Sequence, residues 1–306
     1  MTVNKVNLPE SNITQNNQVE RVTYLGMVVN IVLALVKIIV GYASLSLGLI
    51  ADGFHSFSDL GTDLAVLVGA RLAGRPPDLN HPFGHGKFET IAAWGISIIL
   101  ILIGAGITYK GFVYFLNPQT TVNGLWVIIV AVISLLSKEI LYQLTARAAV
   151  QTKSHALHAN AWHHRSDAFS SAVVLVGGIA GMMGWSRGDS VAGLLVGVMV
   201  IMVGGKLGFE ALMELSEASP GRDVEDNLRV VLSNVDEIRD YHRLRVRRIG
   251  RELEMDVHIV LDPDYSIRKG HEIVIDIENR LKDSFDMPIN PVIHVDPDIE
   301  ELRIRS

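Results

Sequence analysis

The sequence predicts a membrane protein with an all-α domain of six transmembrane helices, followed by a small α+β domain. Three observations predict this division. The 306-residue chain is 49% hydrophobic with a mean hydropathy of +0.30, a combination too apolar for an ordinary soluble domain. Residues 1–209 carry 13 Lys and Arg against 10 Asp and Glu, a net charge of +3, whereas residues 210–306 carry 14 against 23, a net charge of −9. The long apolar runs all lie in the first part.

The chain begins with a polar segment, which is followed by six apolar stretches long enough to cross a bilayer. Residues 1–20 lack the apolar core and small-residue cleavage site of a signal peptide, so we expect a disordered cytosolic tail there. A spanning helix needs roughly 20 mostly apolar residues. Six candidates meet this length and define a transmembrane domain over 21–209; they lie at about 22–42, 46–72, 88–115, 122–146, 160–184 and 189–209.

The basic residues predict that both chain ends face the cytoplasm. The links on one side of the six spans carry only Lys110 and Arg187. The N-terminal segment and the links after the second and fourth spans carry Lys5, Arg21, Arg71, Arg75, Lys87, Arg147 and Lys153. Because cytoplasmic links are enriched in Lys and Arg, the second set marks the cytoplasmic side. An even number of spans also requires that both ends share a side.

The acidic segment at 210–306 predicts a small cytoplasmic domain with the order α-β-β-α-β. "DVEDNLRVVLSNV" has helical spacing, and "YHRLRVRRIG" and "ELEMDVHIVL" alternate like a strand pair with Gly250 in the turn. "IRKGHEIVIDIENRLKDSF" predicts a second helix and "PVIHVDPD" a final strand. This order predicts a ferredoxin-like sandwich of one sheet under two helices. An acidic domain argues against nucleic acid as a partner and suits cations.

Two copies of one polar pattern interrupt the apolar spans. In the second span His55 precedes Asp59 by four residues, and in the fifth His163 precedes Asp167 by four. This spacing puts each pair on one helix face. Two imidazoles and two carboxylates make a tetrahedral ligand set of the kind that zinc favours. The alternative is a purely structural role, in which polar side chains form hydrogen bonds between neighbouring helices. The duplication of the pair within apolar spans favours an ion site, because intramembrane carboxylates mark ion paths.

Other polar residues in the spans have other interpretations. Asp52 and Asp63 lie near the same helix face as His55, where they would orient imidazoles or carry protons. We expect Arg165 to snorkel or to pair with a carboxylate, for which Asp63 is a candidate. Lys37 and Lys138 are predicted to form interior pairs or snorkelling ends rather than to bind metal.

These motifs resemble those of the cation diffusion facilitator family. The resemblance rests on His55-x-x-x-Asp59, on "HHRSDAFSS", on the loop "RPPDLNHPFGHGKFET" and on six spans before a small domain, and it covers about residues 20–298. It implies a homodimer, associated through its cytoplasmic and transmembrane domains, that exports divalent metal, usually Zn²⁺, against protons by alternating access. It further implies that the transport site is formed by His55, Asp59, His163 and Asp167, and that the protein lies in a bacterial inner membrane.

The resemblance also raises two further clusters to candidate metal sites. Asp78, His81 and His85 lie in the loop, where the alternatives are a solvated loop and a Lys87 that pairs with an acid such as Glu217. In the C-terminal domain, alternation puts His294 and Asp296 on one strand face. Family members bind regulatory metal with residues that match His242, His258, His271, His294 and Asp296; the alternative is a set of surface histidines in an acidic domain.

Three other functions remain open at this level. The same carrier could take Fe²⁺, Co²⁺, Ni²⁺, Cd²⁺ or Mn²⁺ in place of Zn²⁺. A membrane metal sensor would bind the ion without moving it. An enzyme is disfavoured, because the chain has no cysteine, no His-Glu-x-x-His motif and no recognisable nucleophile set. The absence of cysteine also excludes disulfides and thiolate metal ligands.

Overall fold

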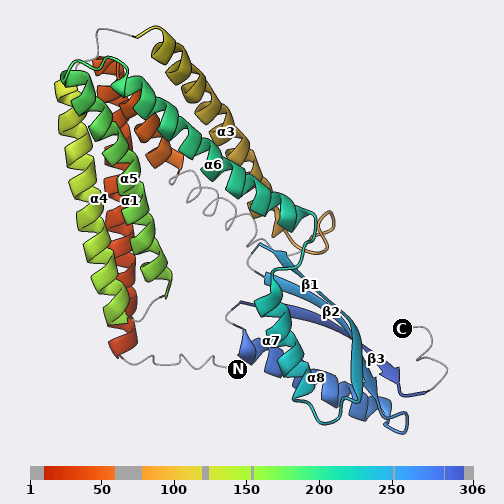
Figure 1. Ribbon diagram of the computed structural model, residues 1–306. Coiled ribbons are helices and arrows are strands. Elements are labelled where there is room, and N and C mark those ends of the chain that lie inside the picture. The colour runs from red at the N-terminus through yellow and green to blue at the C-terminus, as the bar shows by residue number, and fades with distance from the viewer. Residues whose placement is uncertain are drawn as a thin grey trace. The chain divides into compact units, whose positions relative to one another are not determined.

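The computed structural model describes residues 10–58, 78–118, 124–152, 155–250, 252–285 and 287–299. The chain divides into two compact units, which are described separately. One contains the residues up to 64 together with 96–206, and the other contains 65–95 together with 207–306. The fold class is the predicted one, with long apolar helices followed by an α+β domain (Figure 1).

The first unit consists of long helices, and two of these helices, at 87–116 and 188–215, extend into the second unit. The helices are α1 (Glu10–Ser44), a helical segment at 47–58, α3 (Lys87–Leu116), α4 (Gly124–Thr152), α5 (His155–Met182) and α6 (Gly188–Leu215). Within the described residues, four stretches are long and apolar enough to cross a membrane: Tyr24–Ser44, Lys87–Leu116, Gly124–Gln151 and Gly188–Leu215. α5 is less apolar because it carries the polar cluster at 163–167.

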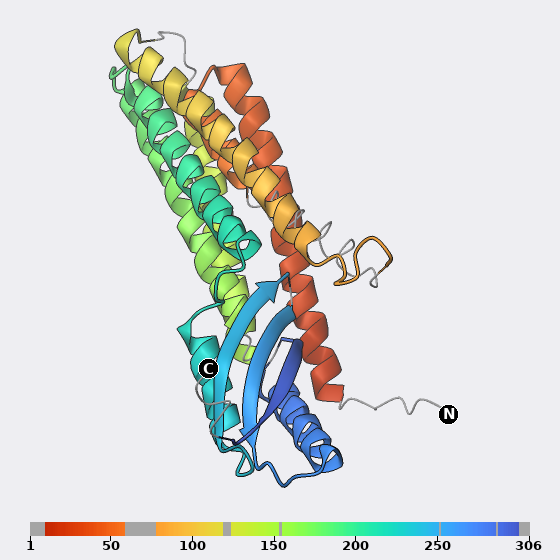
Figure 2. The same cartoon turned by 90° about the vertical axis from the view of Figure 1, so that its right-hand side faces the viewer.

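Two helix groupings position the polar residues of this unit. α4 packs along both α1 and α5 (Figure 1). α3 runs beside α6 in both views (Figures 1 and 2), and a Cβ added at Gly104 would lie only 2.9 Å from the carbonyl oxygen of Gly197. Small residues allow such close approach between apolar helices.

The start of α6 is bonded to the start of the helical segment at 47–58. The buried carboxylate of Asp189 accepts hydrogen bonds from the Ser46 hydroxyl, from the Leu47 amide at 2.7 Å and from the Gly48 amide at 3.3 Å. These amides belong to the first turn of a helix, where they have no partner within the helix itself. Asp189 therefore caps a neighbouring helix rather than its own.

One predicted boundary is wrong, and another stays a prediction. α1 begins at Glu10, so residues 10–20 are helical and are not part of a disordered tail; only 1–9 of that segment lie outside the described residues. The predicted domain boundary at 209–210 lies three residues beyond the division between the two compact units at 206 and 207, and α6 continues through both positions to Leu215. Extending a helix that has already formed orders only one residue per added hydrogen bond, so a helix can continue past the end of an apolar run.

The C-terminal domain has the predicted order of elements. α7 (Arg222–Ser233) precedes β1 (Asp240–Ile249) and β2 (Glu252–Leu261), and α8 (Ile267–Ser284) connects β2 to β3 (Ile289–Pro297). The sheet order is β1-β2-β3, with β1 antiparallel and β3 parallel to the central β2. Gly250 lies between β1 and β2 with a φ of 58°, a conformation that glycine adopts without strain.

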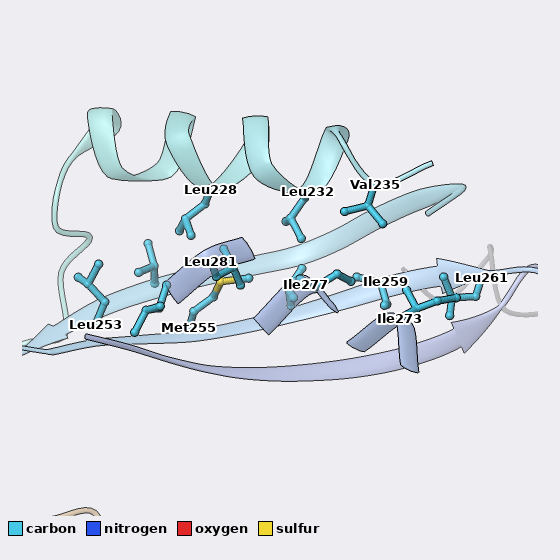
Figure 3. Close-up of a cluster of buried hydrophobic side chains, with 13 residues drawn as sticks. Leu228, Leu232, Val235, Leu253, Met255, Ile259, Leu261, Ile273, Ile277 and Leu281 are labelled. Carbon is cyan, nitrogen blue, oxygen red and sulfur yellow. The ribbon is translucent and has the colours of Figure 1, made fainter. Parts of the chain in front are cut away.

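The hydrophobic core of this domain lies between one face of the sheet and the two helices (Figure 3). β2 alternates, with odd-numbered residues such as Met255 and Ile259 buried in the core and even-numbered ones turned to the other face. α8 contributes Ile273, Ile277 and Leu281, whose spacing of four residues forms one helix face. The opposite face of the sheet is thus available for polar side chains.

Candidate metal sites

The His163–Asp167 pair lies on one face of α5, as the spacing predicts. His163 Nδ1 is 3.7 Å from Asp167 Oδ1. The Asp167 side chain is only 4% exposed, whereas that of His163 is 50% exposed. One member of the pair is therefore embedded among the helices, and the other lies at their surface.

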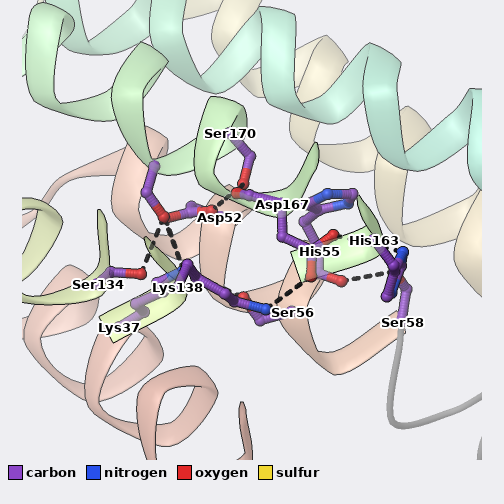
Figure 4. Close-up of polar contacts among 11 residues, drawn as sticks. Lys37, Asp52, His55, Ser56, Ser58, Ser134, Lys138, His163, Asp167 and Ser170 are labelled. Carbon is purple, nitrogen blue, oxygen red and sulfur yellow. Dashed lines mark hydrogen bonds and ion pairs between the residues drawn. The ribbon is translucent and has the colours of Figure 1, made fainter. Parts of the chain in front are cut away.

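His55 lies near this pair. It belongs to the helical segment at 47–58, its side chain is buried, and its Nδ1 has no hydrogen-bond partner among the described residues. The Asp167 carboxylate interacts electrostatically with its imidazole, and both side chains are drawn in Figure 4. Asp59, the fourth predicted ligand, lies outside the described residues. Of this predicted set, the structure places His163 against Asp167 and His55 within the electrostatic reach of Asp167, but the three are not among the groups of described residues whose ligand atoms all lie within 4.8 Å of one another.

Two buried lysines pair with two buried carboxylates (Figure 4). Lys138 of α4 donates to Asp167 Oδ2 at 2.7 Å, and Lys37 of α1 lies 2.9 Å from Asp52 Oδ2. Both lysine side chains are fully buried. Of the two alternatives predicted for Lys37 and Lys138, interior pairs and snorkelling ends, the structure shows interior pairs. Pairing offsets the high cost of placing a lone charge in an apolar interior.

Asp52 belongs to a hydrogen-bonded network that joins several helices. Its carboxylate accepts from the Ser170 hydroxyl at 2.6 Å and from the Ser171 hydroxyl at 2.8 Å, besides its contact with Lys37. Lys37 in turn donates to the hydroxyls of Ser56 at 3.1 Å and Ser171 at 3.0 Å. The network connects α1, the segment at 47–58 and α5. Its carboxylate is bound by lysine and serine rather than by an imidazole.

The sequence analysis missed the burial of His164. This residue is only 3% exposed and lies against Gly26 of α1, and neither ring nitrogen has a hydrogen-bond partner within the described part of the chain. A signal was present, because the small residues Ala161, Ala168 and Ser171 share its helix face.

Arg165 lies against two aromatic rings. It donates to the Tyr142 hydroxyl at 3.1 Å, and its guanidinium lies 4.8 Å from the Tyr142 ring centroid and 5.6 Å from that of Trp162. Asp63, its predicted partner, lies outside the described residues.

The loop cluster of Asp78, His81 and His85 is assembled in the second unit. Asp78 Oδ1 lies 3.4 Å from His81 Nδ1, and Asp78 Oδ2 lies 3.4 Å from His85 Nε2. One ligand atom from each residue lies within 4.8 Å of the others. The Asp78 carboxylate also accepts from the amides of His81 at 2.7 Å and Asn80 at 2.9 Å, and these bonds hold the pKa of Asp78 below its usual value. An ionised carboxylate beside two imidazoles suits a divalent cation.

Glu217 fixes the segment that follows this loop to the C-terminal domain. Its carboxylate accepts from Lys87 Nζ at 2.8 Å and from Arg247 Nη1 at 2.9 Å. Close by, the Glu214 carboxylate accepts from the Thr90 hydroxyl at 2.6 Å and from the Gly250 amide at 2.7 Å. The predicted Lys87–Glu217 pair is confirmed. It occurs together with the histidine cluster, so the two interpretations of the loop do not exclude each other.

Glu217→Gln should lower thermal stability at neutral pH and have no effect in acid. The hydrogen bond from Lys87 and the charge of Arg247 hold the pKa of Glu217 below its usual value, so the folded state binds fewer protons there than the unfolded state. The stabilisation is present above the ordinary pKa of a glutamate, about 4.3, and is lost as the pH falls below that value through the lowered folded-state pKa. Thermal unfolding of both proteins between pH 3 and 7 checks this; a constant difference at all pH values would contradict it.

The C-terminal cluster forms a row across the sheet. His242 of β1 pairs with His258 of β2, which pairs with His294 of β3. Asp296 lies two residues further along β3 and contacts all three: its distances are 3.5 Å to His242 Nε2, 2.9 Å to His258 Nδ1 and 3.2 Å to His294 Nε2. His258 belongs to the face of the sheet opposite the core. His271, the fifth predicted ligand, is exposed on α8 and is not brought to this row.

Asp296→Ala should remove divalent-ion binding from the C-terminal domain. Asp296 is the only carboxylate that the described residues place against this histidine row, so its loss leaves three imidazoles without a common anion. In calorimetric titration with Zn²⁺, the variant should bind the ion at the histidine row at least about tenfold more weakly than wild type, so that this class of sites is no longer detected. Asp298→Ala is the matched control, since Asp298 contacts Arg239 instead. Equal titrations of wild type and Asp296→Ala would contradict the assignment.

Apolar helices of spanning length, together with clusters of imidazole and carboxylate ligands, define a multi-pass membrane protein that handles metal cations. Comparisons with known proteins identify the family. Residues 23–216 match the family model described as "Cation efflux transmembrane domain", and residues 220–298 match "Cation efflux protein, cytoplasmic domain". The chain belongs to the cation diffusion facilitator family of divalent metal efflux transporters.

Relatives with curated names support this membership. The chain is 36% identical over 294 residues to "Metal tolerance protein C1" of Arabidopsis thaliana. This match covers 91% of this chain and 62% of the length of that protein. The chain is 29% identical over 296 residues to "Manganese efflux system protein MneP" of Bacillus subtilis, and this match covers 94% of this chain and 99% of that protein. Among solved structures, the metal-bound C-terminal domain of the CzcD transporter from Thermotoga maritima is 29% identical, covering 24% of this chain and 87% of that one, with a TM-score of 0.24.

Proposed function

We propose that this divalent metal efflux transporter exports Zn²⁺ from the cytoplasm in exchange for protons. The cargo would be bound by His55, Asp59, His163 and Asp167. The observation that supports this most is the buried Asp167 carboxylate, which lies 3.7 Å from His163 on α5 and interacts electrostatically with His55 of the segment at 47–58. Two imidazoles with carboxylates form the ligand set that suits tetrahedral Zn²⁺.

Proton exchange follows from the chemistry of these ligands. An imidazole binds a metal ion only when it is neutral, and a carboxylate only when it is ionised, so loading the site releases protons and protonation favours unloading. Imidazole titrates in the physiological pH range. Alternating access would expose the site first to the cytoplasm and then to the other side, by tilting of helices about the bound ion.

Manganese is the second candidate cargo. The "Manganese efflux system protein MneP" of Bacillus subtilis matches nearly the whole chain. Carboxylate and water ligands suit Mn²⁺, whereas imidazole ligands suit Zn²⁺ better. Fe²⁺, Co²⁺, Ni²⁺ and Cd²⁺ are further cargoes of the same class, and a sensor that binds metal without moving it is the alternative outside that class.

The other two clusters and the assembly complete the proposal. We assign the loop cluster and the C-terminal histidine row to regulatory cation binding, the latter in a cytoplasmic domain that follows α6. The match to a cytoplasmic-domain family model supports a homodimer. The excess of basic residues in the links after the second and fourth spans supports cytoplasmic chain ends. We expect a bacterial inner membrane as the location.

Metal flux into proteoliposomes tests the proposal. Wild-type protein should move Zn²⁺ when a pH gradient is imposed, and collapsing the gradient should stop net uptake. Added Mn²⁺ should compete only weakly. Faster movement of Mn²⁺ than of Zn²⁺ would keep the transporter and overturn the zinc assignment. Metal binding with no flux of any metal would establish the sensor instead.

A further inference from the structure

The two buried lysines of the transmembrane domain are held in different ways. Lys37 has three partners, namely Asp52 and the hydroxyls of Ser56 and Ser171. An ammonium group has three donors, so Lys37 is saturated. Lys138 is equally buried, yet its one hydrogen-bond partner among the described residues is Asp167.

The carboxylates paired with these lysines also differ in how many hydrogen bonds they accept. Asp52 has both oxygens bound, by Ser170 on Oδ1 and by Lys37 and Ser171 on Oδ2. Among the described residues, Asp167 has Lys138 on Oδ2, and its Oδ1 faces His163 at 3.7 Å. The Lys37–Asp52 pair is a saturated structural contact. Within the described part of the chain, one hydrogen bond joins Lys138 to Asp167, and Asp167 is a candidate ligand of the cargo.

The position of Lys138 has two opposite effects on a metal ion at Asp167. Without metal, the ammonium neutralises a carboxylate that would otherwise be buried as an isolated charge, which stabilises the empty carrier. With a divalent ion on the Oδ1 side, the ammonium on Oδ2 repels the ion and draws on the same negative charge. It also fixes the carboxylate so that Oδ1 remains directed towards His163.

We propose that Lys138 is a positioning residue that acts as a tethered competitor of the cargo for Asp167, weakening metal binding so that the ion is released during each cycle. This proposal rests on the proposed function, since it requires Asp167 to be a ligand of the transported ion. A carrier must not hold its cargo too tightly, because slow release limits turnover. The lysine remains on Oδ2 as an intramolecular cation, and it neutralises Asp167 once the metal ion has left the Oδ1 side.

Lys138→Met removes the charge and keeps most of the side-chain volume. In proteoliposomes, the variant should reach half-saturation at a Zn²⁺ concentration at least about tenfold lower than wild type, with a lower maximal flux. Lys138→Arg keeps the charge and should restore wild-type values in both. A purely structural lysine would predict the reverse, namely weaker binding in Lys138→Met. Unchanged or weakened metal binding in Lys138→Met would overturn the proposal.

Two further variants separate the possible causes. Lys37→Met is the matched control, because it removes the other buried lysine; it should lower thermal stability without tightening metal binding, and equal tightening would overturn the specific role of Lys138. If Lys138→Met does not fold, Lys138→Gln keeps a hydrogen-bond donor without the charge and should show the same tighter binding. Asp167→Asn separates failure of the proposed cargo site from failure of the Lys138 proposal. If Asp167→Asn retains full metal flux, Asp167 is not a cargo ligand and the proposed cargo site fails. If Asp167→Asn loses flux while Lys138→Met binds metal as wild type does, only the role of Lys138 as a competitor is refuted.

Discussion

Asp167→Asn is expected to abolish metal transport while the protein remains in the membrane. Asparagine keeps the shape of the side chain but removes the anion that His163, Lys138 and the cargo would share. The loss of outer partners of metal ligands already costs about 10–100-fold, so the loss of a ligand should lower zinc flux by more than about 100-fold. Flux into proteoliposomes under a pH gradient measures this directly.

A second variant controls for damage to the fold. Asp167→Asn leaves the Lys138 ammonium buried without its counter-ion, which is itself destabilising. The double variant Asp167→Asn with Lys138→Met removes both charges, and it should regain thermal stability without regaining flux. If the double variant transports zinc, stability rather than metal ligation explains the effect of the single change.

Asp52→Asn should give the largest loss of stability in the transmembrane domain. It leaves the fully buried Lys37 without a counter-ion and weakens the bonds to Ser170 and Ser171 that join the segment at 47–58 to α5. Removing one partner of a buried ion pair costs about 3–5 kcal/mol. Thermal unfolding in detergent should show a clearly lower midpoint than for wild type.

The paired control is Asp52→Asn combined with Lys37→Met. Replacing both members of a buried pair by neutral residues is often close to neutral in stability, so the double variant should recover most of the loss. An equally unstable double variant would show that the serine bonds, and not the charges, are responsible. An unfolding midpoint unchanged in Asp52→Asn would contradict the role of the network.

The contacts within one helix were predictable from the sequence, and those between helices were not. His163 and Asp167 are four residues apart, and helix geometry alone puts such residues on one face. For Lys37 and Lys138 the sequence predicted either interior pairs or snorkelling ends, and the structure shows interior pairs. The sequence could not select their partners, because Asp52 and Asp167 are both buried carboxylates and the choice depends on how α1, α4 and α5 pack.

The same limit applies to the C-terminal domain. Alternating residues predicted the strands and the shared face of His294 and Asp296. The direct opposition of His242, His258 and His294 depends on the register between strands, and α8 separates β3 from β2 in the chain, so the local sequence does not set the β2–β3 register. His271 was included on the strength of a resemblance, and its position on the helix layer separates it from the row within one chain.

Asp189 has a mechanical consequence for the proposed alternating-access cycle. Its carboxylate holds the first turn of the segment at 47–58, through Ser46, Leu47 and Gly48, to the first turn of α6. Separating the two helices there would strip three donors from a buried carboxylate. In that cycle we therefore expect the segment to pivot at residues 46–48. His55 lies further along the segment, so a small rotation about this pivot would displace it more than the bonded turn.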